Sequence, residues 1–192
     1  DIIHGGHGRD YLDGQLGNDT LYGDGGVDFV YGGMGDDVVY ATLDDDTIDG
    51  GPGSDTVVSD RAVPIVELRY TGSNSTGTSP ATLYHKQDSS HSLSTFTLSN
   101  IETVRLLGGS LDNTFILTNW SGSAFIAGGG GSDTLQVIGD TNMILKDATP
   151  AATATDSALY GFATGATLSL PSDGPTYHLS NLAHVSLGGG PG

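Results

Sequence analysis

The sequence contains no cysteine, and basic residues are almost as scarce, with 6 lysines and arginines against 23 aspartates and glutamates. The absence of cysteine excludes disulfide bonds and thiolate metal sites. The formal net charge of -17 at pH 7 repels phosphate backbones and anionic lipid headgroups. Nucleic acid and ordinary membranes are therefore not expected as direct partners, whereas cations are attracted.

Long apolar segments and helical patterns are missing as well. No stretch approaches the roughly 18 apolar residues of a membrane-spanning helix, so no membrane span is expected. No segment keeps an amphipathic helical period, since even the alanine-rich residues 148–158 contain Pro150 and several threonines. Hydrophobic residues make up 36% of the 192 residues, and 31 residues are glycine. This composition favours stacked turns around a narrow interior over a thick packed core.

A catalytic arrangement is also absent from the sequence. Serine, histidine and aspartate are all present, but no Gly-x-Ser-x-Gly nucleophile motif occurs. The aspartates occupy repeated turns, which a unique acid–base pair would not do. The six histidines lack the spacing of three or four convergent zinc ligands. We therefore expect a protein that is not an enzyme.

What the sequence does have is a nine-residue repeat. In frame it reads Gly-Gly-x-Gly-x-Asp-x-aliphatic-x, six times from Gly5 to Val58. A fixed short period of this kind is the signature of a repeat architecture. The repeated aspartates are Asp1, Asp10, Asp19, Asp28, Asp37, Asp46 and Asp55, and the aliphatic residues two positions after them are Ile3, Leu12, Leu21, Val30, Val39, Ile48 and Val57.

The three residues after each aspartate predict a short β-strand, because they are β-branched, aromatic or aliphatic. The middle side chain of each strand should face inward and its two neighbours outward. Two nonapeptides running in opposite directions form one coil, which stacks on the next coil at about 4.8 Å. Tyr22 and Tyr40, which are two repeats apart, should then stack on one outer face, with Tyr31 on the other.

The repeat divides the chain into four parts. Residues 1–58 form the regular block, although the fifth copy, Ala41 to Asp46, has no turn glycine and leaves its ion site in doubt. Residues 59–107 are an irregular β module. Residues 108–136 hold degenerate turns, with Asn113 where an aspartate belongs and a good copy ending in Asp133. Residues 137–192 form a second irregular β module that ends in the first residues of a new repeat.

A longer repeat links the two irregular modules. Residues 98–106 match residues 179–187, and both segments lead into glycines. Because the nine-residue frame is interrupted at both ends of the sequence, we expect the chain to be an excerpt from a longer array. The whole chain is predicted to be β-structure.

The turns offer the ligands that a hard cation prefers. Ca²⁺ takes six to eight oxygens in a flexible geometry, and each turn supplies backbone carbonyls and one carboxylate. One turn cannot surround an ion, but two turns that lie two repeats apart can, which pairs Asp1 with Asp19, Asp10 with Asp28, and so on to Asp37 with Asp55. Without an ion, each close carboxylate pair costs about 1–4 kcal/mol. Mg²⁺ demands a tighter octahedral shell, and zinc and copper prefer nitrogen and sulfur ligands.

The repeat resembles the RTX (repeats-in-toxin) calcium-binding nonapeptides, most closely over residues 1–58 and less closely over 108–136. The resemblance implies an all-β parallel β-roll, or β-solenoid, continued by less regular strands. It also implies calcium ions between the turns, roughly four to six in number, held by the aspartates and by the carbonyls of the first four turn residues. Here these positions are Asp1, Gly5, Gly6, His7, Gly8, Asp10, Gly14, Gly17, Asp19, Gly23, Asp24, Gly25, Gly26, Asp28, Gly32, Gly33, Met34, Gly35, Asp37, Asp46, Gly50, Gly51, Gly53, Asp55, Gly128, Gly129, Gly131 and Asp133.

Proteins with such repeats are exported by type I secretion and fold on meeting external calcium. The leading interpretation is a structural or adhesive repeat segment of a large bacterial protein at the cell surface, with adjacent repeats, further copies of itself or surface glycans as partners. The alternative is the secretion and folding region of an exported enzyme or toxin. A third interpretation is carbohydrate binding by the irregular half, with Trp120 and Tyr84 as contacts.

Overall fold

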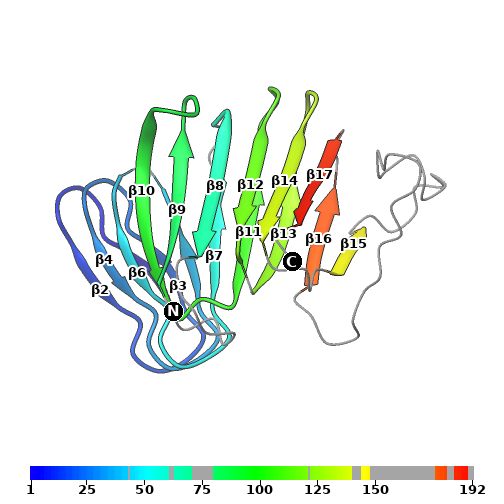
Figure 1. Ribbon diagram of the computed structural model, residues 1–192. Helices are drawn as coiled ribbons and strands as arrows, with labels where there is room; N and C mark the ends of the chain where they lie inside the picture. Colours follow the sequence, from blue (N-terminus) through cyan, green and yellow to red (C-terminus); the bar gives the residue numbers. More distant parts are fainter. Residues whose placement is uncertain are drawn as a thin grey trace.

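The computed structural model describes residues 1–42, 44–60, 63–70, 80–120, 122–139, 144–147, 176–180 and 184–189. The elements of this part of the chain are β-strands arranged in two sheets, which are stacked along the molecule in chain order except that β8 to β10 lie in reverse order and β15 lies beyond β16 (Figure 1). The expected all-β fold of stacked parallel strands is confirmed. No helix in the described ranges has the length and hydropathy to cross a membrane.

Each coil contributes strands to both sheets. The first sheet contains, in spatial order, β1 (Ile2–His4), β3 (Thr20–Tyr22), β5 (Val38–Tyr40), β7 (Thr56–Ser59), β11 (Thr103–Leu107), β13 (Ser123–Ala127), β16 (Thr176–Ser180) and β15 (Ile144–Asp147). The second contains β17 (His184–Gly189), β14 (Thr134–Gly139), β12 (Thr114–Thr118), β8 (Ile65–Tyr70), β9 (Ala81–Lys86), β10 (Ser92–Ser99), β6 (Thr47–Asp49), β4 (Phe29–Tyr31) and β2 (Tyr11–Asp13).

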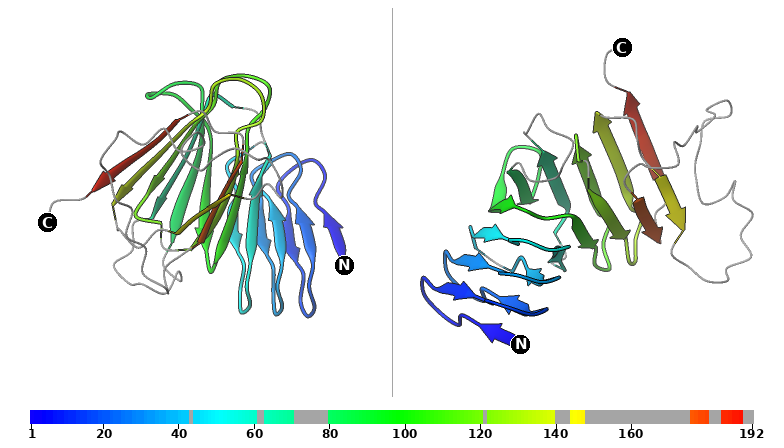
Figure 2. Two further views of the ribbon diagram at one scale, coloured as in Figure 1. Left: turned by 90° about the vertical axis from the view of Figure 1, so that its right-hand side faces the viewer. Right: turned by 90° about the horizontal axis from the view of Figure 1, so that it is seen from below.

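In the N-terminal block each coil consists of two nonapeptides, as the repeat predicts. Leu21 pairs with Ile3 and Val39 in the first sheet, and Val30 pairs with Leu12 and Ile48 in the second, always in parallel. The alternation of strands between the sheets is visible in Figure 2. Tyr22 and Tyr40 stack as expected, with ring centroids 4.4 Å apart.

Beyond β7 the coil lengthens while the stack continues. Thr103 pairs with Ser123 and Thr114 with Thr134, so each coil is now longer than two nonapeptides. The strands lengthen from three or four residues to mostly five or six, and β10 has eight. The irregular half therefore belongs to the same parallel stack, with wider sheets than the repeat block.

One segment departs from the expected parallel order. β9 pairs antiparallel with both β8 and β10, and these three strands are inserted between β6 and β12 in the second sheet. The sequence pattern predicts β-structure for residues 59–107 but not the direction of the strands. The physical reason is that alternation of apolar and polar residues specifies which face a side chain takes, and says nothing about which neighbour the strand pairs with.

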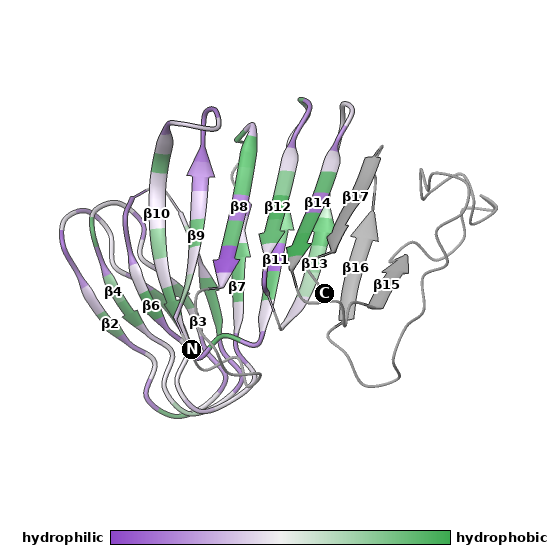
Figure 3. Ribbon diagram, viewed as in Figure 1, coloured by the Kyte–Doolittle hydropathy of each residue, from purple (hydrophilic) through white to green (hydrophobic). Residues whose placement is uncertain are grey.

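A single hydrophobic core runs through the coils. Figure 3 shows hydrophobic colour on many of the strands, including β8, β12 and β14, although much of β9 and one end of β8 are hydrophilic. The aliphatic position of each repeat supplies it in the N-terminal block, where Leu21 and Val39 are fully buried. Phe96 and Phe115 fill the wider interior of the irregular half. A one-residue slip would expose this entire set, so the aliphatic position fixes the register of every coil.

The two matching segments of the longer repeat cross between the sheets in opposite directions, from the second sheet to the first at β10 and β11 and from the first to the second at β16 and β17. Residues 98 and 99 end β10 and precede β11, and residues 179 and 180 end β16 and precede β17. In both cases the chain passes from one sheet to the other. The alanine-rich residues 148–158 lie outside the described residues.

The buried aliphatic position gives a direct test of the core. Leu21→Ala should lower the free energy of unfolding by about 2–5 kcal/mol, because the cavity inside a narrow coil cannot collapse. Leu16→Ala makes the same change at a side chain that is 76% exposed and should stay within about 0.5 kcal/mol of the parent. Urea unfolding in the presence of calcium measures both, and equal losses would contradict the inward assignment of Leu21.

Candidate metal sites in the stacked turns

The repeated aspartates form two columns along the stack, one at each edge of the coils. Along each column the backbone amide of one aspartate donates to Oδ1 of the aspartate one coil later. The distance is 2.8 Å from Asp19 to Asp37 and 2.9 Å from Asp37 to Asp55 in one column, and 2.8 Å from Asp10 to Asp28 in the other. One carboxylate oxygen of each aspartate therefore fixes the spacing of neighbouring turns.

The second oxygen, Oδ2, has no hydrogen-bond partner although it is buried. Burying a carboxylate oxygen without a partner costs several kcal/mol, and buried polar atoms in native proteins are almost always paired. The same unpaired atom recurs at equivalent positions instead of occurring once by accident. The residues concerned are Asp10, Asp19, Asp28, Asp37, Asp55 and Asp133.

Four of these oxygens, those of Asp10, Asp19, Asp37 and Asp55, lie close to a backbone carbonyl oxygen of the adjacent turn, beside the first glycine of their own turn. A β-carbon on Gly32 would lie 2.5 Å from Asp37 Oδ2 and 2.5 Å from the carbonyl oxygen of Gly50. A β-carbon on Gly5 would lie 3.1 Å from Asp10 Oδ2 and 2.7 Å from the carbonyl oxygen of Gly23. The first glycine thus keeps open a small space lined by oxygens.

The second glycine of the turn is needed for a different reason. Gly33 and Gly51 have φ values of 108° and 90°, which residues with a side chain rarely adopt. Gln15 and Asp24 occupy the same turn position with φ values of 70° and 66°. These two copies reach the required turn at a conformational cost, since residues other than glycine seldom adopt positive φ.

The donor set fits Ca²⁺. Carboxylate and carbonyl oxygens, several from each of two turns, match the ligands and the flexible geometry of a calcium shell. In the described part of the chain, no group of three or more histidine, cysteine, aspartate or glutamate side chains is arranged to hold a metal ion. Backbone carbonyls must therefore complete any site, which is what the glycine turns provide.

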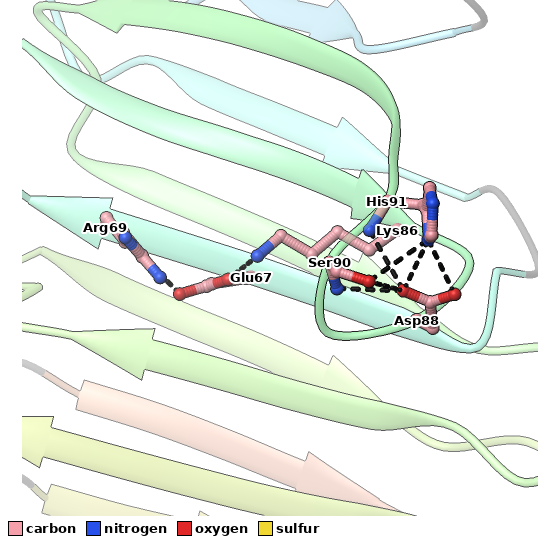
Figure 4. Close-up of polar contacts among 6 residues, drawn as sticks. All are labelled: Glu67, Arg69, Lys86, Asp88, Ser90 and His91. Atoms are coloured by element: carbon pink, nitrogen blue, oxygen red, sulfur yellow. Dashed lines mark hydrogen bonds and ion pairs between the residues drawn. The ribbon is translucent and has the colours of Figure 1, made fainter.

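Glu67 is a buried carboxylate outside the columns that, unlike the column aspartates, is paired with basic side chains. Glu67 on β8 is 4% exposed and accepts hydrogen bonds from both Arg69 and Lys86, which neutralise it (Figure 4). Burial would raise the pKa of Glu67, but the hydrogen bonds from Lys86 and Arg69 outweigh burial and lower it. Within the described residues, the lysine and arginine ion pairs go to Glu67 and not to the aspartate columns.

The pKa values of several column aspartates are raised, as expected for buried carboxylates without a basic side chain beside them. Burial is the main cause that raises the pKa of Asp46 and of Asp55 to about 6, and neighbouring carboxylates raise it further. Burial likewise raises the pKa of Asp37, with the charges of Asp19 and Asp36 adding to it. Without a bound cation, Asp46 and Asp55 would therefore take up protons at about pH 6, well above the range of an ordinary aspartate.

The degenerate fifth copy has a different turn, as its missing glycine suggests. At Gly23 the three atoms nearest to an added β-carbon belong to Asp28 and to Asp46, whose Oδ2 lies at 3.5 Å, and include no carbonyl oxygen. Ala41, which replaces the turn glycine, is fully buried and donates to the carbonyl of Val58. The coil continues through this copy while the carbonyl ligand found at the other turns is replaced by a carboxylate.

Asn113 stands in an aspartate position and behaves as an amide. Its backbone amide donates to Asp133 Oδ1 at 2.8 Å, which continues the column pattern across the longer coil. Its side chain accepts from the amide of Gly109 and donates to the carbonyl of Val63. Both ends of the amide are satisfied within the protein, so Asn113 needs no cation.

The structure places the predicted turn residues at the two edges of the stack. His7 and Met34 lie in these turns with exposed side chains, and His7 forms an isolated bridge with Gly25. The expectation that Trp120 contacts a carbohydrate is wrong, because its ring is 6% exposed and its indole nitrogen donates to the carbonyl of Ser123. Tyr84 is half-buried beneath Arg69 and Lys86.

One carboxylate of the columns was missed in the sequence. Glu102 Oε2 accepts the amide of Asp55 at 2.8 Å, as each column aspartate accepts the amide of the aspartate before it. No period of nine leads from Asp55 to Glu102, so the spacing could not have identified it. Its one sequence signal is that it directly precedes a strand-like run, as every column aspartate does.

Comparison with known families agrees with this geometry. The family model described as RTX calcium-binding nonapeptide repeat (4 copies) matches residues 1–30 and, a second time, residues 31–61. The first part of the chain thus consists of RTX calcium-binding nonapeptide repeats. No significant match to the chain is found among curated proteins.

Asp37 tests whether the unpaired oxygens bind an ion. Asp37→Asn keeps an oxygen to accept the amide of Asp19 but removes the charge, and it should weaken calcium binding by about tenfold or more because calcium affinity depends on ligand charge. Asp36→Asn is the matched control, because Asp36 is exposed and Asn18 already occupies the equivalent position one coil earlier. Calorimetric calcium titration compares the two, and equal affinities would contradict a ligand role for Asp37.

The raised pKa values of Asp46 and Asp55 predict that protonation of these carboxylates partly substitutes for calcium in stabilising the fold. Their folded pKa of about 6 lies above the unfolded value of about 3.9, so the folded chain binds more protons between these values. In metal-depleted protein the free energy of unfolding should therefore fall as pH rises from about 4 to about 6. Circular dichroism of metal-depleted protein should show more β-structure at about pH 5 than at about pH 7, and the opposite order would contradict it.

Proposed function

We propose that this chain is a calcium-binding structural or adhesive repeat segment of a large extracellular bacterial protein, and that it folds when calcium binds. The observation that supports this proposal is the row of buried aspartate oxygens without partners, four of which lie close to a carbonyl oxygen of the adjacent turn. The RTX match over residues 1–61 supports the same cation.

Calcium supplies the positive charge that the columns lack. The chain's own contribution is to place carboxylates and carbonyls one coil apart, through the bonds from each aspartate amide to the next Oδ1. These oxygens come together only when two coils stack, so the unfolded chain has no preformed site. Binding to the folded state alone then stabilises the stack in proportion to the logarithm of calcium concentration.

An extracellular location is consistent with this coupling. Sites of the extracellular class bind calcium in the 10⁻⁴–10⁻³ M range, so such a chain stays unfolded where calcium is scarce and folds where it is plentiful. The net charge of -17 adds to this dependence, because charge repulsion opposes compaction until cations bind.

The described residues favour a structural role over catalysis. The arrangement nearest to a catalytic one is His85, whose ring nitrogens contact the hydroxyls of Ser59 at 2.7 Å and Ser94 at 3.1 Å. All three side chains are buried in the core. A substrate cannot reach this cluster, so we assign it to packing between the repeat block and the inserted strands.

The adhesive part of the proposal is supported by the outer faces of the repeat block. Tyr11 and Phe29 stack with ring centroids 5.2 Å apart and are 68% and 37% exposed. On the other sheet His4 stacks on Tyr22 at 4.4 Å. Such regularly spaced aromatic side chains offer flat surfaces for contact with a partner.

Calcium-dependent folding is the test of the proposal. Circular dichroism of the full chain should show coil after chelation and β-structure with calcium at about 1 mM, the concentration range of extracellular sites. Magnesium at the same concentration should be much less effective, because it dehydrates reluctantly and needs a tighter octahedral shell. Full folding with magnesium alone, or without any divalent ion, would overturn the assignment.

A further inference from the structure

A segment outside the nine-residue repeat lies on the last complete turn of the N-terminal block. β10 pairs in parallel with β6, which places Ser99 beside Asp49, and the amide of Gly50 donates to the carbonyl of Ser99 at 3.0 Å. One coil earlier the amide of Gly32 donates to the carbonyl of Asp49 at 2.9 Å. Residues 98–102 therefore stack on the turn of Gly50 as one repeat turn stacks on another.

Asn100 provides the carbonyl that a glycine provides elsewhere. A β-carbon on Gly50 would meet the carbonyl oxygen of Asn100 and, at 2.6 Å, Oδ2 of Asp55. The equivalent β-carbon on Gly32 would meet the carbonyl of Gly50 and Oδ2 of Asp37. The oxygen-lined space beside Asp55 thus resembles the one beside Asp37. The difference is that its carbonyl oxygen comes from Asn100, which lies outside the nine-residue repeat.

Glu102 provides the carboxylate that closes this space. It accepts the amide of Asp55 through Oε2 at 2.8 Å, as Asp55 accepts the amide of Asp37 through Oδ1 at 2.9 Å. The amides of Glu102 and Thr103 both donate to the carbonyl of Asp55, at 3.2 and 3.0 Å. Asp55 itself is fully buried, and its Oδ2 has no hydrogen-bond partner.

The other aspartate column ends differently. Thr97 pairs with Thr47, so the residue that follows Asp46 along that column is Phe96. Phe96 is fully buried and offers no oxygen from its side chain. The continuation by Glu102 is therefore specific to the column of Asp19, Asp37 and Asp55.

We propose that Asp55, Glu102 and the carbonyl of Asn100 form a terminal calcium site, one half supplied by the nine-residue repeat and the other by residues 98–102. This inference rests on the proposed calcium-dependent function and extends it beyond the residues that match the RTX family. The site joins the regular block to the irregular half of the stack. Calcium bound there orders the corner from which β11 continues the first sheet.

The test is calcium binding by the full chain with Glu102→Gln. The amide oxygen of glutamine can still accept the amide of Asp55, so the variant removes the charge while keeping the hydrogen bond. We expect one calcium ion fewer than in the parent chain, or one ion bound at least about tenfold more weakly, by calorimetric titration. Asp60→Asn removes one charge from an exposed residue at the other end of β7 and should leave the number and affinity unchanged.

An unchanged ion number and affinity in Glu102→Gln, with the parent chain binding calcium, would overturn the terminal site alone. A parent chain that binds no calcium would instead overturn the proposed function itself. If Glu102→Gln does not reach the β-signal of the parent at saturating calcium, Glu102→Asp decides. A full set of ions in this variant, which keeps the carboxylate, supports the site, and loss of an ion despite the retained charge counts against it.

Discussion

The structure depends on how buried carboxylates are neutralised. Each coil places an aspartate inside the edge of the stack, uses one of its oxygens to hold the neighbouring turn, and leaves the other without a partner. Water is excluded from these atoms, and the described lysine and arginine ion pairs lie elsewhere. A divalent cation between adjacent turns converts the repulsion within a column into an attraction, so the same residues oppose or stabilise stacking according to the ion.

Glu67 is a buried carboxylate that is neutralised by basic side chains instead of by a cation. It is as deeply buried as the column aspartates, but Arg69 and Lys86 pair with it directly, and its pKa falls where those of Asp46 and Asp55 rise. The irregular part of the stack therefore uses internal charge pairs and larger apolar side chains such as Phe96 and Phe115.

The coil lengthens beyond the repeat block without a break in the first sheet. β11 pairs with both β7 and β13, so it joins the short strands to the long ones, and the carboxylate of Glu102 lies where this change occurs. The second sheet makes the same transition by inserting β8, β9 and β10, of which β9 runs antiparallel to its two neighbours. Parallel stacking on both sides of the insertion keeps a single continuous core.

The sequence by itself determined the strands, the inward aliphatic side chains, the coil of two nonapeptides and the acidic turns, because each of these follows from a local period that any stacked arrangement must satisfy. The resemblance to RTX repeats made calcium the expected ion, and the donor set of the turns fits that ion. Only the tertiary structure decided the direction of β9, the burial of Trp120 and the arrival of Asn100 and Glu102 beside the turn of Asp55. These features join residues far apart in the sequence, and the pairing of distant segments depends on which surfaces can be buried together, which no local pattern specifies.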